Sequence, residues 1–286
     1  MLTLSNDTLT VSLLDPASPT DRQRVGTRYC WGGYIWQVED ATVGPLLTGP
    51  EWPEPSPDPY NGQGLPESFR SHEFGTDRPL HIENGRGFIL GVGDVAETRA
   101  GDLEVTAPCD WEVTSEEGQM VFTTEQSGHG YACRLGRWIR LGDRSIVSYS
   151  VLENLGERPL PLHWFAHPFF ALTDGQITCD LPASWSMDAN EGFALDAVNR
   201  LSLQRKFRDT TDGHFQHLHV GDSMLTAILS HPTLDRVTFT TDFIPDLCPV
   251  WGNSATWSIE PYLMTEVAPG EMHTWGLTYH FGPVTG

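Results

Sequence analysis

The feature that most constrains the fold is an alternation of apolar and polar residues with a period of two. It recurs in "TLTVSLL" (8–14), "IVSYSVL" (146–152) and "TWGLTYHF" (274–281). Successive side chains of a β-strand point to opposite faces, so this pattern predicts strands with one buried face. The faces expected to be buried carry Leu9, Val11 and Leu13; Val147, Tyr149 and Val151; and Trp275, Leu277, Tyr279 and Phe281.

Turn-forming sequences separate these segments, among them "LGDRS" (141–145), "NLGERP" (154–159) and "APGE" (268–271). The chain contains 28 glycines and 21 prolines, which disfavour long helices, and no capped helical stripe is evident. The pattern therefore predicts an all-β protein of two or more packed, mainly antiparallel sheets. No repeat or composition break divides the chain, so residues 1–286 are expected to form one domain.

Charge and cysteine usage narrow the function classes. The net charge of −21 repels phosphate backbones and anionic membranes, so a neutral small molecule is a better expected partner than nucleic acid. The N-terminus lacks the basic start of a signal peptide, and no stretch reaches the roughly 18 apolar residues of a membrane span. Five widely spaced cysteines without a CxxC pair favour reduced thiols and a cytoplasmic location.

The segment Gly44–Phe69 is rich in proline and glycine and cannot form a central strand. It also contains Trp52, Tyr60 and Leu65, whereas disordered linkers are poor in aromatic residues. We expect an ordered loop that covers part of the molecule, although an interdomain linker is the alternative.

The segment "LPLHWFAHPFFAL" (160–172) is the first candidate for chemistry. The prolines argue against a helix, and in an extended chain His163 and His167 share a face with Phe165 between them. Histidine titrates near neutral pH, so each ring is either a hydrogen-bonded core residue or a working acid or base. The neighbouring aromatic residues, which could stack on the apolar face of a sugar, are Trp164, Phe165, Phe169 and Phe170.

The second candidate is Glu260 in "WSIEPYL" (257–263), which shares a strand face with Ser258. Burial in this apolar strand would raise the pKa of the carboxyl group and make it a useful base near neutral pH. The alternative is a glutamate at a strand edge that faces water.

Two further groups are weaker candidates. In "TTDFIPDLCPVWGN", Asp242 could bind sugar hydroxyls and Trp251 could stack on a ring, or they could be a loop aspartate and a core tryptophan. In "HFQHLHV", His217 and His219 could form a metal pair, but no third ligand is evident and a surface histidine cluster is preferred. Neither a dinucleotide fingerprint nor a GxSxG elbow is present, so no cofactor and no metal are expected.

In their order along the chain, these motifs resemble the galactose mutarotase-like superfamily, which includes aldose 1-epimerases and hexose-6-phosphate mutarotases. "YSVLENLGERPLPL" leading to "AHPFF" places His167 at the family's histidine. "WSIEPYLMTEVAPGEMHTWGLTYHF" places Glu260 at its glutamate. "GQGLPESF" and "RYCWGGYIWQVE" resemble the family's glycine-proline loop and early glycine-containing strands. The resemblance implies a β-supersandwich.

The resemblance also implies a function. It suggests an aldose 1-epimerase that interconverts the anomers of a hexose, with Glu260 as base, His167 as acid and His163 as a supporting residue. The chain lacks the family's clean arginine and second histidine motifs, and the residues that could replace them or hold the sugar are Arg70, His72, His81, Phe170, Asp242 and Trp251. A neutral sugar is the expected substrate, and the protein is expected to be a monomer or homodimer. A non-catalytic carbohydrate-binding protein and a metal-dependent sugar isomerase remain open.

Overall fold

The computed structural model describes residues 1–69 and 84–285, and these form an almost entirely β structure. They contain 25 strands and one short helix, α1 (Pro19–Val25). Every strand pairing within this part of the chain is antiparallel. The all-β, antiparallel expectation is confirmed.

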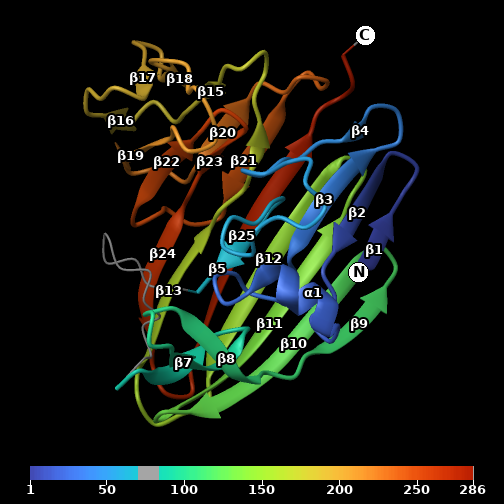
Figure 1. Cartoon of the computed structure of the whole chain (residues 1–286), viewed down its shortest axis with the longest axis vertical. Helices are drawn as coiled ribbons and strands as arrows, with labels where there is room; N and C mark the ends of the chain where they lie inside the picture. Colours follow the sequence, from blue (N-terminus) through green and yellow to red (C-terminus); the bar gives the residue numbers. More distant parts are fainter. Residues whose placement is uncertain (70–83, 286) are drawn as a thin grey trace.

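A ten-stranded sheet is the largest element of the molecule (Figure 1). Its four longest strands are adjacent, and they come from the middle and the end of the sequence. In sheet order the strands are β17 (Phe193–Leu195), β18 (Arg200–Leu203), β15 (Thr178–Asp180), β20 (Thr226–Leu229), β21 (Val237–Thr241), β25 (Met272–Phe281), β12 (Ser145–Asn154), β11 (Tyr131–Leu141), β10 (Gln119–Gly128) and β9 (Glu112–Glu116).

Smaller sheets pack against it. One contains β1 (Leu2–Ser5), β2 (Leu9–Leu13), β3 (Ile35–Asp40) and β4 (Gly44–Pro45), and another contains β6 (Arg86–Ile89), β7 (Gly93–Glu97) and β8 (Leu103–Pro108). Two further sheets position the candidate site. One has three strands, β24 (Tyr262–Val267), β13 (Leu160–Ala166) and β5 (Glu67–Ser68). The other has five strands, β14 (Phe170–Ala171), β23 (Thr256–Ile259), β22 (Cys248–Gly252), β19 (His214–His219) and β16 (Ser186–Met187).

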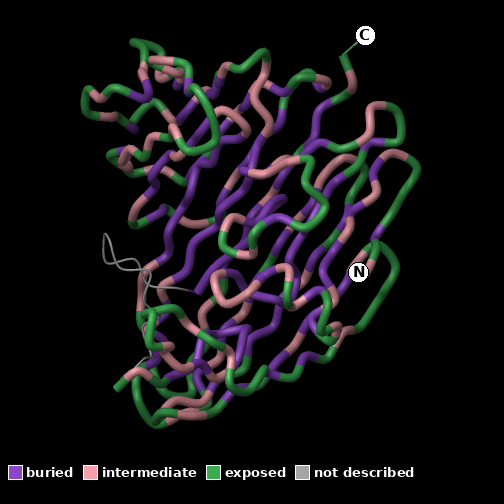
Figure 2. The backbone as a smooth tube through the Cα atoms, viewed as in Figure 1, coloured by how far each residue is buried: buried purple, intermediate pink, exposed green. Residues whose placement is uncertain are grey.

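The core lies between the large sheet and the smaller ones. In β11, Leu135 and Ile139 point inward and are fully buried, whereas Arg134 and Arg140 point outward and are exposed. One continuous apolar cluster joins residues of β2, β3, β11, β13, β22 and β25. Figure 2 shows the buried chain running along the middle of the strands, with exposed chain at the loops.

One predicted strand face is wrong. In β12 the buried residues are Ile146, Ser148, Ser150, Leu152 and Asn154, while Val147, Tyr149 and Val151 face outward. The orientation is inverted because Ser148 belongs to a buried hydrogen-bond network, described below, which an apolar pattern cannot indicate. In β2 and β25 the predicted faces are buried as expected.

The proline-rich segment Gly44–Phe69 is an ordered loop. Leu47 bridges to Phe170, and Leu65 bridges to Ile35. Its last residues form β5, which pairs with β13. No helix among the described residues is long and apolar enough to cross a membrane.

Candidate active site

His167 follows β13 and is held by the end of the proline-rich loop. Its backbone N–H donates to the carbonyl of Pro66 at 2.9 Å, and the N–H of Phe169 donates to the carbonyl of Gly64 at 2.8 Å. Pro168 between them cannot donate, so the chain leaves the strand at this point. The imidazole is therefore fixed by backbone contacts on both sides of the proline.

Glu260 lies in the short connection between β23 and β24. Its backbone N–H donates to the carbonyl of Pro249 at 2.9 Å, and the carbonyl of Pro261 accepts from the N–H of Ala166 at 3.3 Å. The second bond ties the glutamate segment directly to the strand that carries His167. As a result, Glu260 Oε1 lies 3.3 Å from His167 Nε2, and each side chain is only 5% exposed.

Burial controls the charge of Glu260. It raises the pKa of the carboxyl group to about 8, because removing the carboxylate from water is costly. The positive charge of Arg28 and the nearby Ser258 hydroxyl oppose this shift only in part. The alternative of a water-facing glutamate is thus wrong, and the carboxyl group can gain or lose a proton near neutral pH.

Aromatic rings surround the imidazole. The centroid of the His167 ring lies 4.4 Å from that of Phe169, 6.0 Å from that of Trp251 and 6.2 Å from that of Tyr29. Trp251, a predicted substrate-binding residue, is half-buried in β22 and is brought next to the histidine. Tyr29 and Phe169 are fully buried, so of these three rings the half-buried Trp251 is the one that is partly exposed beside the His167–Glu260 pair.

Arg28 is a site residue that the sequence patterns did not single out. Its guanidinium lies over the rings of Tyr29, at 5.1 Å, and Tyr60, at 4.3 Å, and donates to the carbonyl of Tyr60 at 2.6 Å. It lies in the loop between α1 and β3, within the glycine-containing segment noted above. A single arginine before an aromatic residue has no distinctive spacing, so only its place in space reveals it.

A buried polar network lies behind the histidine strand. Glu67 of β5 pairs with Ala166 of β13, the residue before His167. Its carboxylate forms an ion pair with the fully buried Arg137 and accepts hydrogen bonds from Ser148 Oγ at 2.7 Å and Trp164 Nε1 at 3.0 Å. This network joins β5, β11, β12 and β13 and fixes the strand from which His167 extends.

Several predicted residues lie elsewhere. Trp164 is fully buried and binds Glu67, so it cannot stack on a sugar as expected. Phe170 is buried in the core, with its ring centroid 5.5 Å from that of Trp257 and 6.1 Å from that of Phe239. Its neighbour Phe169 is the one that touches the imidazole.

Asp242 is exposed at the end of β21, and its carboxylate accepts a hydrogen bond from the N–H of Gly276 at 2.7 Å. His163 is half-buried, and burial lowers its pKa. The remaining predicted residues, Arg70, His72 and His81, lie outside the described residues.

The structure does not support the metal alternative. His217 and His219 share a face of β19, and His219 Nε2 lies 3.1 Å from Asp188 Oδ2, with both of these side chains exposed. Within residues 1–69 and 84–285, no three His, Cys, Asp or Glu side chains are grouped so that they could hold a metal ion.

A scan of protein-family models finds no match to this chain, and a comparison with curated proteins finds none either. Solved structures do match along almost the whole length. A galactose mutarotase related enzyme from Lactobacillus acidophilus is 13% identical, with a TM-score of 0.59, covering 99% of this chain and 98% of that one. A galactose mutarotase-like protein from Lactobacillus casei is 14% identical, with a TM-score of 0.60 and coverage of 98% and 99%. A galactose 1-epimerase from Lactobacillus acidophilus is 11% identical, with a TM-score of 0.52 and coverage of 98% and 93%. This chain therefore has the galactose mutarotase-like fold.

Proposed function

We propose that this protein is an aldose 1-epimerase that interconverts the α and β anomers of a hexose by general acid–base catalysis. Glu260 acts as the base and His167 as the acid. The observation that carries the proposal is the nearly buried pair itself, with Glu260 Oε1 3.3 Å from His167 Nε2.

The geometry of the pair suits mutarotation. The anomeric hydroxyl oxygen and the ring oxygen of a pyranose are both bonded to C1, so a base and an acid for them must lie close together. The Glu260 carboxylate removes the proton of the anomeric hydroxyl while His167 protonates the ring oxygen, and the C1–ring-oxygen bond breaks. The open aldehyde rotates about the C1–C2 bond, and the ring closes on the other face with the two roles exchanged.

The proton balance of the pair also fits. Below pH 8 the Glu260 carboxyl group holds a proton, because burial raises its pKa to about 8. Transfer of that proton to Nε2 of His167, 3.3 Å away, produces the carboxylate and imidazolium that the reaction needs. No net proton is gained or lost over the cycle.

The surroundings favour a neutral sugar. Trp251, which is half-buried beside His167, offers an aromatic face to the C–H groups of a pyranose, and the Arg28 guanidinium is a hydrogen-bond donor for hydroxyls. The net charge of −21 disfavours a phosphorylated sugar.

The test is polarimetry of freshly dissolved α-glucose and α-galactose. We expect Glu260→Gln to lower the rate of mutarotation about a hundredfold or more, because the amide cannot accept the proton. Glu266→Gln is a matched control, since Glu266 is exposed on the adjacent strand β24 and should behave as wild type. Circular dichroism confirms that both variants fold.

Two outcomes would contradict the proposal. Wild-type rates in Glu260→Gln would exclude the assigned base. A wild-type protein that is stabilised by sugars but does not speed mutarotation would instead indicate the carbohydrate-binding alternative.

A further inference from the structure

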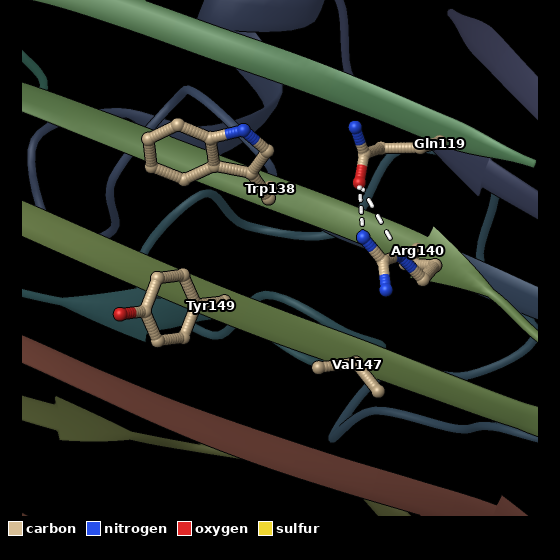
Figure 3. Close-up of a pocket in the computed structure, with 5 residues that line it drawn as sticks. All are labelled: Gln119, Trp138, Arg140, Val147 and Tyr149. Carbon is tan, nitrogen blue, oxygen red and sulfur yellow. Dashed lines mark hydrogen bonds between the residues drawn. The ribbon is translucent and has the colours of Figure 1, made fainter. Parts of the chain in front are cut away.

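A pocket lies on the outward face of the ten-stranded sheet. It is a cavity of ≈ 390 Å³ lined by Gln119, Trp138, Arg140, Val147 and Tyr149 (Figure 3). The lining residues come from three adjacent strands, β10, β11 and β12. Nothing in the proposed epimerase chemistry uses this pocket.

Strand register builds the pocket. Trp138 lies opposite Tyr149, and Arg140 lies opposite both Gln119 and Val147. Arg137, the neighbour of Trp138, points the other way and is fully buried against Glu67. The pocket and the His167–Glu260 pair are therefore on opposite faces of the ten-stranded sheet.

Two glycines give the aromatic rings their orientation. A Cβ at Gly136 would come within 2.7 Å of the Trp138 ring, so the indole leans across that glycine. Gly276 lies opposite Tyr149, and a Cβ there would be 3.4 Å from the phenol ring. The ring centroids are 6.1 Å apart and the planes are inclined by 58°, so the rings form two walls of an open groove.

The third side of the groove is polar and held in place. Arg140 donates from Nε and Nη2 to Gln119 Oε1, at 3.3 and 3.1 Å. Gln119 Nε2 in turn donates to Glu116 Oε2 at 3.0 Å. These bonds hold a guanidinium, a group with several N–H donors, beside two aromatic walls (Figure 3).

We propose that this groove is a second saccharide site that takes a hexopyranose unit of a neutral oligosaccharide. A pyranose has an apolar C–H face, which matches the walls formed by Trp138 and Tyr149, and a hydroxyl edge, which matches the donors of Arg140. The volume of ≈ 390 Å³ is at the lower end of ligand pockets, a size that suits one or two sugar rings.

A protein partner fits this surface less well. A stable interface buries about 800 Å² on each partner and needs a contiguous apolar centre. Here the same sheet face carries the exposed ion pairs of Arg134 with Glu125 and Glu153, at 2.7 Å each. These charged side chains interrupt the apolar surface of the face, and the groove itself has the volume of a small-ligand pocket.

The experiment is calorimetric titration of the wild-type chain with maltotetraose, cellotetraose, mannotetraose and galactotetraose. At least one is expected to bind, and Trp138→Ala is expected to weaken that binding at least about tenfold through loss of a stacking face. Trp138→Phe, which retains an aromatic wall, should recover most of the affinity. Glu260→Gln should bind as wild type, which separates this site from the proposed catalytic one.

The outcomes separate the explanations. Absence of binding to all four tetrasaccharides, or equal binding by wild type and Trp138→Ala, would overturn the proposal. So would a wild-type dimer that Trp138→Ala converts to a monomer without any sugar binding, since the groove would then be a subunit contact. Mutarotation by Trp138→Ala should equal that of wild type, so the two functions succeed or fail separately.

Discussion

At the scale of the residue, the central fact is an acidic side chain held almost out of water. The positive charge of Arg28 and the Ser258 hydroxyl both lower the pKa of Glu260, yet burial still raises it to about 8. A carboxyl group in this state costs folding free energy when it is charged. Such a cost is typical of a functional group rather than of a stabilising one.

This cost predicts a pH dependence of stability. Between pH 4.5 and about 8 the unfolded chain releases the proton of Glu260 while the folded chain keeps it. The folded state binds more protons in this window, so the free energy of unfolding falls as pH rises, by up to about 1.4 kcal/mol per pH unit from this group. The loss is complete above about pH 8.

Urea unfolding at pH 5.5 and 7.5 checks this prediction. We expect wild type to lose more stability between the two values than Glu260→Gln, whose amide does not titrate. Other groups titrate in both proteins and cancel in the difference. Parallel pH profiles for the two proteins would contradict this prediction, because they would show that folding does not raise the pKa of Glu260.

At the scale of the element, the candidate site depends on one three-stranded sheet, in which β13 lies between β24 and β5. His167 directly follows β13, Glu260 lies just before β24, and Pro66 and Glu67, at the start of β5, lie against the histidine segment. The ion pair of Glu67 with Arg137 ties this group to the large sheet. Removal of either partner would leave an uncompensated charge in the interior.

We therefore expect Arg137→Met to destabilise the protein by about 3–5 kcal/mol, because Glu67 would remain buried without its cation. The matched control is Arg200→Ala, which breaks an exposed ion pair whose side chains are 51% and 44% exposed. That change should have little effect on stability, because an exposed ion pair is screened by water. Urea denaturation measures both, and similar losses in the two variants would contradict the assigned role of the buried pair.

Gly64 offers a second test at this scale. It has φ of +77°, and a Cβ would collide with the carbonyl oxygens of Ile35 and Trp36. Gly270 has φ of +75° but nothing within 4 Å of its Cβ position. Gly270→Ala should cost about 1–2 kcal/mol from backbone strain alone, whereas Gly64→Ala should cost about 3 kcal/mol or more.

Thermal and urea unfolding of the two glycine variants separates strain from collision. Gly64→Ala should also lower the proposed mutarotation, because the carbonyl of Gly64 accepts from Phe169, the residue that packs on the His167 imidazole. Equal losses of stability in the two variants would show that the backbone near Gly64 adjusts freely.

At the scale of the whole molecule, each of the two faces of the ten-stranded sheet carries residues of a proposed site. Its inner face carries Arg137 and Ser148, which support the proposed catalytic pair, and its outer face carries the Trp138–Tyr149 groove. The same two strands, β11 and β12, supply both. This is possible because consecutive residues of a strand point to opposite sides.

The closed core also predicts the behaviour of the thiols. All five cysteines are free and buried, and burial raises the pKa of Cys30 to about 11 and that of Cys109 and Cys133 to about 12. We expect no thiol to react with DTNB within minutes at pH 8 in the native protein, since thiolates are scarce and shielded. All five should react in denaturant, and rapid native reaction of any cysteine would contradict the described packing.

Local sequence determined the class of this fold and the two central residues of its candidate site. Alternation with a period of two and frequent glycine and proline act over a few residues, so strands and turns can be predicted without knowing their partners. His167 and Glu260 were candidates because each is a titratable residue in an apolar segment next to a proline, and the resemblance to the galactose mutarotase-like superfamily assigned their roles.

Only the tertiary structure decided which groups meet. The 3.3 Å contact between Glu260 and His167, the electrostatic effect of Arg28 and the burial of Glu67 with Arg137 all depend on how separate sheets pack. The structure also decided that Tyr149 faces outward and Phe170 inward, against the prediction for both. Alternation shows that a strand has two different faces. Contacts with the neighbouring sheet, including those of its polar groups, determine which face is buried.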